Sequence, residues 1–337
     1  MGEIHALAAK QAGAKLEPYS YDPGPLGDEQ VEIEVQYCGI CASDIGLIEN
    51  EAGWATFPLV PGHEAIGKVV AVGSNTKLVK PGQTVGLGWN SGSDLYCRQC
   101  LNGDYHLCDH IEMTIVGRHG AYATRVRCHW IWATPIPEGV NIATAGPLLC
   151  GGITVFSPII DHHVKPTDRV GVVGIGGLGH MAVRFLNHWG CHVTAFTTSA
   201  GKADELKKLG AHAIVNTHSE EELNKIQGSL NFIISTVSGK VDFGAYLNTL
   251  APRGHFHQVG ILPEATLPLP PLFLKQRSFG GSPSGPPATV MAMLDFCGRH
   301  GIQPITEELP MSKANEGIER VKAGKARYRI VLKNDLQ

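Results

Sequence analysis

The sequence has 337 residues, of which 43% are apolar and 18% charged, and its formal net charge is −3. A chain of this length exceeds what one hydrophobic core usually supports, so we expect two folded domains. Lysine and arginine form no basic block, which argues against nucleic acid as a partner, because phosphate binding needs concentrated positive charge.

The first third of the chain alternates short apolar runs with turns that contain proline and glycine. Residues 31–40, 67–73 and 83–89 have the composition and alternation of β-strands. Pro-Gly pairs at 61–62 and 81–82 separate these runs. The pattern predicts a β-rich, barrel-like domain.

From about residue 150, strand patterns alternate with helix patterns. Residues 169–179 form an apolar strand that runs into a glycine turn, and helix 180–190, strand 191–198, helix 202–210 and strand 231–237 follow. This alternation predicts a parallel sheet with right-handed crossovers. We expect loops over 262–287, then helices near 288–300 and 313–323 and a closing strand at 327–333.

A glycine-rich turn lies between the first strand and the first helix of this second part. Its residues are Gly174, Ile175, Gly176, Gly177, Leu178 and Gly179, which fit G-x-G-x-x-G. Glycines at these places permit a tight turn, backbone contact with a pyrophosphate and close helix–strand packing. The helix N-terminus adds a favourable field for the anion. We therefore predict a dinucleotide site here.

The end of the following strand indicates which dinucleotide binds. An NAD site usually has Asp or Glu there, to bind the adenosine ribose. This chain instead has Thr197, Thr198, Ser199 and Lys202, and the first acid after them is Asp204. Hydroxyl and ammonium donors suit a 2′-phosphate, so the sequence favours NADP(H).

Three short segments carry metal-binding residue types. They contain Cys41 in 38–44, His63 in 62–64 and Cys150 in 149–152. Two thiolates and one imidazole can hold zinc and leave a fourth position open for substrate. Single cysteines are more often buried apolar residues, so composition alone does not settle this site.

The motifs G-I-C-x-S-D, P-G-H-E, G-P-L-L-C-G-G-I-T-V-F and G-I-G-G-L-G occur in this order. Together they resemble the zinc-containing medium-chain dehydrogenases, over nearly the whole chain from about Tyr19. Within that superfamily they resemble the cinnamyl-alcohol-dehydrogenase-type branch, and there the bacterial NADPH-dependent aldehyde reductases of broad specificity. The resemblance implies an α/β protein. A GroES-like β-barrel catalytic domain would comprise 1–152 and 287–337, and a doubly wound Rossmann domain 153–286.

The resemblance also implies roles for single residues. Cys41, His63 and Cys150 would bind a catalytic zinc, with Glu64 beside the metal. Asp44 would accept a hydrogen bond from His63 and so orient that ligand. The remaining roles would be contact with the substrate oxygen and proton transfer for Ser43, contact with the nicotinamide for Thr154, and contact with the cofactor phosphates for Arg329.

The activity implied is the reversible reduction of aldehydes to primary alcohols with NADPH. An NAD-dependent oxidative alcohol or polyol dehydrogenase is one alternative, against which Thr197 argues. A non-catalytic nucleotide-binding sensor that kept the fold is another, against which the intact zinc ligands argue.

The resemblance implies a homodimer. Without an apolar run of roughly 18 residues or a signal-like N-terminus, we expect a cytoplasmic protein that does not associate with membranes.

The chain departs from the family pattern in two regions. Ala42 and Gly46 occupy positions where many relatives have histidines of the proton relay, so Ser43 would pass its proton through the ribose hydroxyl and water. The structural zinc lobe of relatives has four cysteines, whereas this chain has Asp94, Cys97, Cys100 and Cys108. Carboxylate oxygen is a competent zinc ligand, so we favour a bound zinc over a metal-free lobe.

Three other groups suggest chemistry that we do not assign to them. Cys38 forms a C-x-x-C pair with Cys41, but Cys41 is better used as a zinc ligand than in redox chemistry. For His162-His163 and for His255 with His257, we expect ordinary solvation or backbone hydrogen bonding rather than metal ligation.

Overall fold

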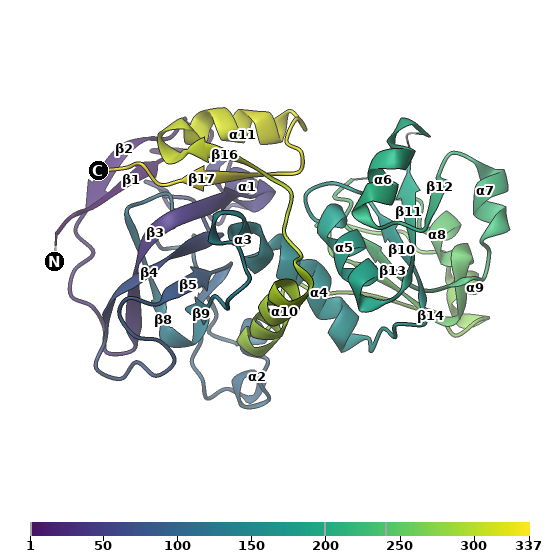
Figure 1. The fold of residues 1–337 in the computed structure, drawn as a ribbon, viewed down its shortest axis with the longest axis horizontal. Helices are drawn as coiled ribbons and strands as arrows, with labels where there is room; N and C mark the ends of the chain where they lie inside the picture. The colour runs from purple at the N-terminus through teal and green to yellow at the C-terminus, as the bar shows by residue number, and fades with distance from the viewer. Residues whose placement is uncertain (1, 199, 240) are drawn as a thin grey trace. The chain divides into compact units, whose positions relative to one another are not determined.

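The computed structural model describes residues 2–198, 200–239 and 241–337. The chain divides into two compact units, Met1–Cys150 with Gly285–Gln337, and Gly151–Ser284 (Figure 1). No single helix among the described residues is long and apolar enough to cross a membrane. One bent pair, Ile142–Leu149 with Gly151–Asp161, meets that test by length and composition alone.

The first unit is built around a seven-stranded sheet in the order β16-β17-β3-β4-β5-β9, with β8 paired to β3. Its strands are β3 (Gln30–Ile40), β4 (Ala65–Val72), β5 (Thr84–Leu87), β8 (Arg125–His129), β9 (Thr134–Pro135), β16 (Thr306–Pro310) and β17 (Arg329–Lys333). Two separate two-stranded sheets accompany it. One pairs β1 (Ile4–Ala8) with β2 (Glu17–Tyr21), and the other pairs β6 (Asn90–Gly92) with β7 (Glu112–Met113). Because β17 pairs antiparallel with β3, both ends of the chain contribute to one sheet.

Short helices connect these strands. They are α1 (Ala42–Ile48), α2 (Arg98–Leu101), α3 (Ile142–Ala145), α10 (Pro287–His300) and α11 (Ala314–Lys322), with the 3-10 turns η1 (Tyr105–Leu107), η2 (Trp130–Trp132), η3 (Gly146–Leu149) and η5 (Met311–Lys313). Alternate side chains of β3, among them Val31, Ile33 and Val35, are buried in the core of this unit. The apolar residues that alternate along the predicted strand therefore lie on the face of the sheet that packs into the core.

The second unit is a six-stranded parallel sheet in the order β12-β11-β10-β13-β14-β15 (Figure 1). Its strands are β10 (Arg169–Val173), β11 (His192–Thr197), β12 (Ala213–Asn216), β13 (Leu230–Ser235), β14 (Leu250–Gln258) and β15 (Ser278–Gly281). The helices are α4 (Gly151–Asp161), α5 (Gly179–Trp189), α6 (Ala203–Leu209), α7 (Glu220–Lys225), α8 (Phe243–Thr249) and α9 (Leu269–Phe273), with the turn η4 (Ala200–Lys202). Counted along the chain, the order is 3-2-1-4-5-6, that of the doubly wound dinucleotide-binding fold. The predicted fold class is confirmed.

The expectation of loops over 262–287 is wrong in part, because α9 and the edge strand β15 lie there. The β15 sequence, SFGG, contains two glycines and has little strand propensity of its own. Pairing with β14 stabilises it, and the Phe279 ring stacks on Phe256 with centroids 5.5 Å apart. Tertiary contacts therefore form a strand that the local sequence does not predict.

Candidate functional site

Two neighbouring strands of the first unit place the first cysteine and histidine. β3 ends at Ile40, directly before Cys41, and β4 begins at Ala65, directly after His63 and Glu64. These ends pair antiparallel with Cys38 opposite Ala65, and the Gly39 amide donates to the Glu64 carbonyl at 3.0 Å. Residues about 20 positions apart in the sequence therefore lie side by side.

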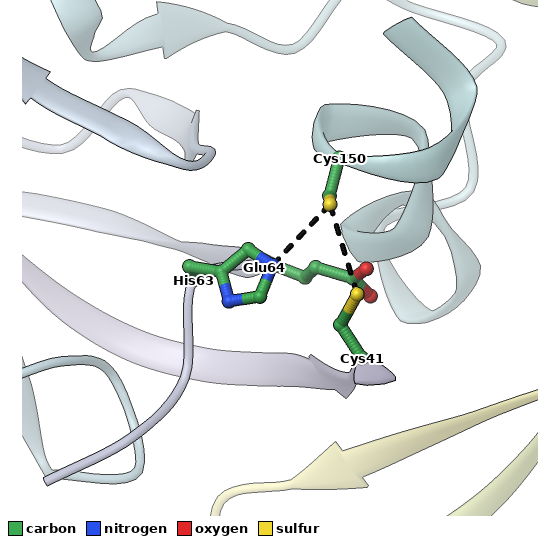
Figure 2. Close-up of side chains that lie close together, drawn as sticks. All are labelled: Cys41, His63, Glu64 and Cys150. Atoms are coloured by element: carbon green, nitrogen blue, oxygen red, sulfur yellow. Dashed lines mark hydrogen bonds between the residues drawn. The ribbon is translucent and has the colours of Figure 1, made fainter. Parts of the chain in front are cut away.

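Cys150 completes the cluster at the end of η3. Figure 2 shows its sulfur facing the Cys41 thiol and the His63 ring. The Cys150 Sγ lies 3.8 Å from the Cys41 Sγ and 3.2 Å from the His63 Nε2. Tetrahedral zinc with Zn–S of about 2.3 Å separates two sulfurs by roughly 3.8 Å. The donor types and their spacing thus fit a zinc ion.

A buried carboxylate connects two of these side chains. Asp44 is fully buried and accepts three hydrogen bonds. Its Oδ2 accepts from the Cys41 amide at 3.0 Å, and its Oδ1 accepts from the Gly62 amide and from His63 Nδ1, each at 2.8 Å. With Nδ1 bonded to Asp44, the Nε2 of His63 points to the sulfurs. A carboxylate behind a histidine in this way fixes the tautomer and orientation of a metal ligand.

Glu64 lies in the same cluster and pairs with Arg329 through its Oε1. Both side chains are buried, and Glu64 Oε2 has no hydrogen-bond partner among the described residues. Burial raises the pKa of Glu64 to about 7, although the Arg329 charge lowers it. A Cβ at Gly39 would meet that Oε2, so glycine there leaves the Glu64 carboxylate in its present position. A buried carboxylate oxygen without a partner, beside two thiols, is consistent with a nearby cation.

The pKa values of the three side chains are shifted in opposite directions, downward for Cys41 and upward for His63 and Cys150. The hydrogen bond from Cys150, with help from His63 and Arg329, lowers the pKa of Cys41 well below its usual value. Burial lowers the pKa of His63, but Asp44 and Cys41 together raise it further, so the net shift is upward. The Cys41 hydrogen bond and burial raise the pKa of Cys150. If Cys150 also ionises, two thiolates lie side by side and need a nearby positive charge, which a divalent metal ion would supply.

Ser43 and Trp89 lie next to these ligands. Ser43 is partly exposed in α1, and its Oγ lies 3.7 Å from the Cys41 Sγ. The Trp89 ring packs edge-on against His63 with centroids 4.9 Å apart. Ala42 and Gly46 have no side-chain group that can carry a proton, so neither position contributes to a proton relay. Ser43 is therefore the hydroxyl available next to Cys41.

The glycine turn of the second unit has the geometry that its motif predicts. Gly174 adopts a φ of +82°, and a Cβ there would lie 2.8 Å from Val237. A Cβ at Gly179 would collide with the Gly174 carbonyl, which keeps the start of α5 close to the strand. Gly176 has open space where a Cβ would lie, and Gly177 and Leu178 complete the turn before α5. The three motif glycines thus serve the turn, the open approach and the close packing.

Residues expected to contact the rest of the cofactor also lie in this unit. Thr197 ends β11, and Thr198 and Lys202 are exposed just beyond it. Ser199 lies outside the described residues. Thr154 is nearly buried in α4 and donates to the Pro283 carbonyl at 3.3 Å.

Asp94, Cys97, Cys100 and Cys108 come together in a separate lobe of the first unit. The Cys97 and Cys108 sulfurs are 3.8 Å apart, and amides of Asp94 and His110 point at the Cys108 Sγ at 3.4 and 3.3 Å. Asp94 Oδ1 accepts from the Cys97 amide at 3.0 Å, and its Oδ2 lies 2.8 Å from His110 Nδ1. These contacts lower the pKa of Asp94 and keep it ionised. Three thiols, a carboxylate and inward-pointing amides suit a closed zinc site.

Comparison with known proteins agrees with this geometry. Residues 27–138 match the model of the alcohol dehydrogenase GroES-like domain, and residues 177–299 match that of zinc-binding dehydrogenases. An aldehyde reductase from Synechocystis, AdhA, is 51% identical over 98% of both chains. The chain belongs to the zinc-dependent medium-chain dehydrogenase/reductase family.

Solved structures of this family have the same fold. A cinnamyl alcohol dehydrogenase from Sorghum bicolor is 35% identical, with a TM-score of 0.93 over 98% of each chain. A protein from Helicobacter pylori titled CAD, solved in complex with NADP(H), is 26% identical, with a TM-score of 0.89 over 98% of each chain. These matches confirm the resemblance inferred from the four sequence motifs.

Sequence reasoning did not identify two contacts of this medium-chain dehydrogenase. Arg329, expected at the cofactor phosphates, instead pairs with Glu64 in the first unit, so its contact with phosphate stays a prediction. His110 bonds to Asp94. Its position two residues after Cys108 was the available sequence signal.

Replacing Asp44 by alanine should lower the free energy of unfolding by about 3 kcal/mol or more. The substitution leaves three buried donors without an acceptor, and each such loss costs roughly 1–3 kcal/mol. Denaturant titration of both proteins measures this. Asp22→Ala is the matched control, because Asp22 is an exposed aspartate that accepts one amide hydrogen bond, from Gly24. Equal stability of Asp44→Ala and Asp22→Ala would contradict the role of Asp44.

Proposed function

We propose that this protein is a zinc-dependent aldehyde reductase that uses NADPH and also runs in reverse as an alcohol dehydrogenase. The observation that carries the proposal is the convergence of Cys41, His63 and Cys150 on one point at zinc spacing. Glu64 lies beside this point and would exchange with water, so three protein ligands would leave a fourth position for substrate, which is typical of catalytic rather than structural zinc. The Synechocystis relative, which is 51% identical to this chain, is named an aldehyde reductase.

Each side chain of the proposed site has a distinct task. Zinc held by Cys41, His63 and Cys150 would act as a Lewis acid on a carbonyl oxygen, while NADPH would supply the hydride. Asp44 holds His63 Nδ1 and the Cys41 amide, and so orients two ligands before substrate arrives. The hydroxyl of Ser43, next to Cys41, donates a proton to the substrate oxygen during reduction and accepts it during oxidation.

We assign catalysis to residues 1–152 with 287–337 and binding of NADP(H) to residues 153–286. The turn from Gly174 to Gly179 would hold the pyrophosphate at the start of α5, and Thr154 would lie near the nicotinamide. Thr197, Thr198, Ser199 and Lys202 would bind the 2′-phosphate, with Arg329 near the other phosphates. The absence of an acid at the end of β11 supports NADP(H), as does the NADP(H) complex of the Helicobacter pylori neighbour.

Asp94, Cys97, Cys100 and Cys108 would hold a second, structural zinc. Aspartate as the fourth ligand is supported by its low pKa and by its place among the three sulfurs. None of the nine cysteines, all of which lie in the described part of the chain, forms a disulfide, and this supports a reducing cytoplasm. A homodimer joined through the Rossmann sheets is compatible with β15 as an edge strand and with exposed apolar side chains in the same unit, including Ile261 and Phe273.

Purified protein should oxidise NADPH in the presence of benzaldehyde or a medium-chain aldehyde, and a zinc chelator should abolish the reaction. Absorbance of the reduced cofactor measures the rate, with NADH in a parallel assay. Faster turnover with NADH would favour the oxidative NAD-dependent alternative. Tight NADPH binding without turnover of any aldehyde or alcohol would favour the non-catalytic sensor.

Lys202→Ala should weaken binding of NADPH by about tenfold and leave NADH binding nearly unchanged. Loss of one charge-assisted hydrogen bond to the 2′-phosphate costs roughly 1.5 kcal/mol, which corresponds to such a factor. Quenching of protein fluorescence measures both dissociation constants. Lys207→Ala, an exposed lysine in α6, is the control. Equal weakening of both cofactors would reject the assignment.

Asp94→Ala should reduce the zinc content by about one ion per chain, because three thiolates alone do not complete a closed site. Elemental analysis after dialysis measures the content. Asp94→Cys restores a four-thiolate set and should keep the ion. Unchanged zinc content in Asp94→Ala would favour the metal-free lobe.

A further inference from the structure

A third cluster of metal-binding side chains belongs to the second unit, whereas both cysteine clusters belong to the first. It consists of His162, His255 and His257, each with a ring nitrogen within 4.8 Å of the others. The Nδ1 of His257 lies 3.1 Å from the Nε2 of His162 and 3.2 Å from the Nε2 of His255. Ligand nitrogens of tetrahedral zinc, at about 2.0–2.1 Å from the ion, lie roughly 3.3 Å apart. The two distances measured from His257 Nδ1 are close to this value.

The fold brings these residues together from two elements. His255 and His257 are two positions apart on β14, so they point to the same face of the sheet. His162 follows the C-terminus of α4, where its amide donates to the Pro158 carbonyl at 3.1 Å. From the sequence, we treat the two pairs separately and expect ordinary solvation or backbone hydrogen bonding for them. The structure instead joins them, because the His162 ring stacks on His255 and packs edge-on against His257.

The outer nitrogens of the two strand histidines have their own partners. His255 Nδ1 lies 2.7 Å from the Ser278 hydroxyl, and His257 Nε2 lies 2.9 Å from the Ser282 hydroxyl. When these nitrogens donate to the serines, the inner nitrogens carry lone pairs that face each other at 3.2 Å. Two such lone pairs repel, and a cation between them removes the repulsion. A ligating histidine that donates its second N–H to an oxygen is the usual arrangement around protein metals.

Charge and exposure also suit an ion. Burial lowers the pKa of His255 to about 4 and that of His257 to about 3, and it lowers the pKa of His162 as well. Neutral imidazole is the form that binds metal ions. His257 is buried and His162 is exposed, so an ion can enter from solvent. The His162 ring stacks on His255 with centroids 3.8 Å apart. Two stacked rings do not direct their nitrogens at one point, so the exposed His162 side chain would rotate when all three histidines bind one ion.

We propose that His162, His255 and His257 form a binding site for a divalent transition-metal ion, separate from the two cysteine-containing sites. Three imidazoles and no thiolate select an ion of the Zn²⁺, Ni²⁺ or Cu²⁺ type over Mg²⁺ or Ca²⁺. The fourth position is open to solvent. The proposal does not depend on the activity proposed above, because the three residues belong to neither cysteine-containing cluster.

The test uses protein that has been loaded with Zn²⁺ and dialysed, so that the cysteine sites are filled. Calorimetric titration with Zn²⁺ should then show one further site per chain in the wild type. His162→Asn should weaken this site by at least about tenfold, since it removes one of three ligands. His163→Asn is the matched control, because it changes the adjacent histidine, which is also exposed and outside the cluster. It should bind as the wild type does.

Co²⁺ gives a second readout at the same site. Added to the zinc-loaded wild type, it should give visible ligand-field bands without the sulfur-to-metal charge-transfer absorption that cysteine ligation produces. The bands should be lost in His162→Asn and in His255→Asn. No further ion in the wild type, or equal binding by His162→Asn and His163→Asn, would overturn the proposal. Aldehyde turnover enters neither readout, so failure here is distinguishable from failure of the proposed function.

Discussion

The proposed chemistry depends on one buried carboxylate. Asp44 has no exposed surface and accepts hydrogen bonds from the Cys41 amide, the Gly62 amide and the His63 ring. These three bonds join the end of β3, the start of α1 and the loop before β4, so the positions of two metal ligands are fixed by the same group. A charge so deeply buried is stable only because its hydrogen bonds are satisfied. Cys150, at the C-terminal end of η3, then lies next to Cys41 and His63, whose positions are already fixed by Asp44.

A second constraint acts at the glycine turn. Only glycine fits at Gly179, where a Cβ would meet the Gly174 carbonyl, whereas the open space at Gly176 is available to a ligand. The motif therefore predicts the local backbone well, because the positive φ of Gly174 and the close backbone contact at Gly179 both favour glycine. The same holds for the long strands, such as β3, whose alternation of apolar residues matches their burial.

Other features could not be predicted, for physical reasons. The strand β15 depends on pairing with β14 and on stacking of Phe279, neither of which is encoded locally. The pairing of Arg329 with Glu64 joins residues 265 positions apart, and the histidine cluster joins His162 to a strand more than 90 positions later. Contacts of this kind follow from tertiary packing, which spacing along the chain does not report. The proposed zinc ligands Cys41, His63 and Cys150, by contrast, lie in short motifs that can be recognised in the sequence.

The central claim is that the metal at Cys41, His63 and Cys150 meets the substrate oxygen directly. The most direct measurement replaces this metal with Co²⁺ and records the visible spectrum with NADPH, before and after an unreactive carboxamide is added. The account predicts that the cobalt bands shift at the concentration at which the amide inhibits aldehyde reduction, because its carbonyl occupies the open ligand position. Competitive inhibition without any change in the cobalt spectrum would contradict the account.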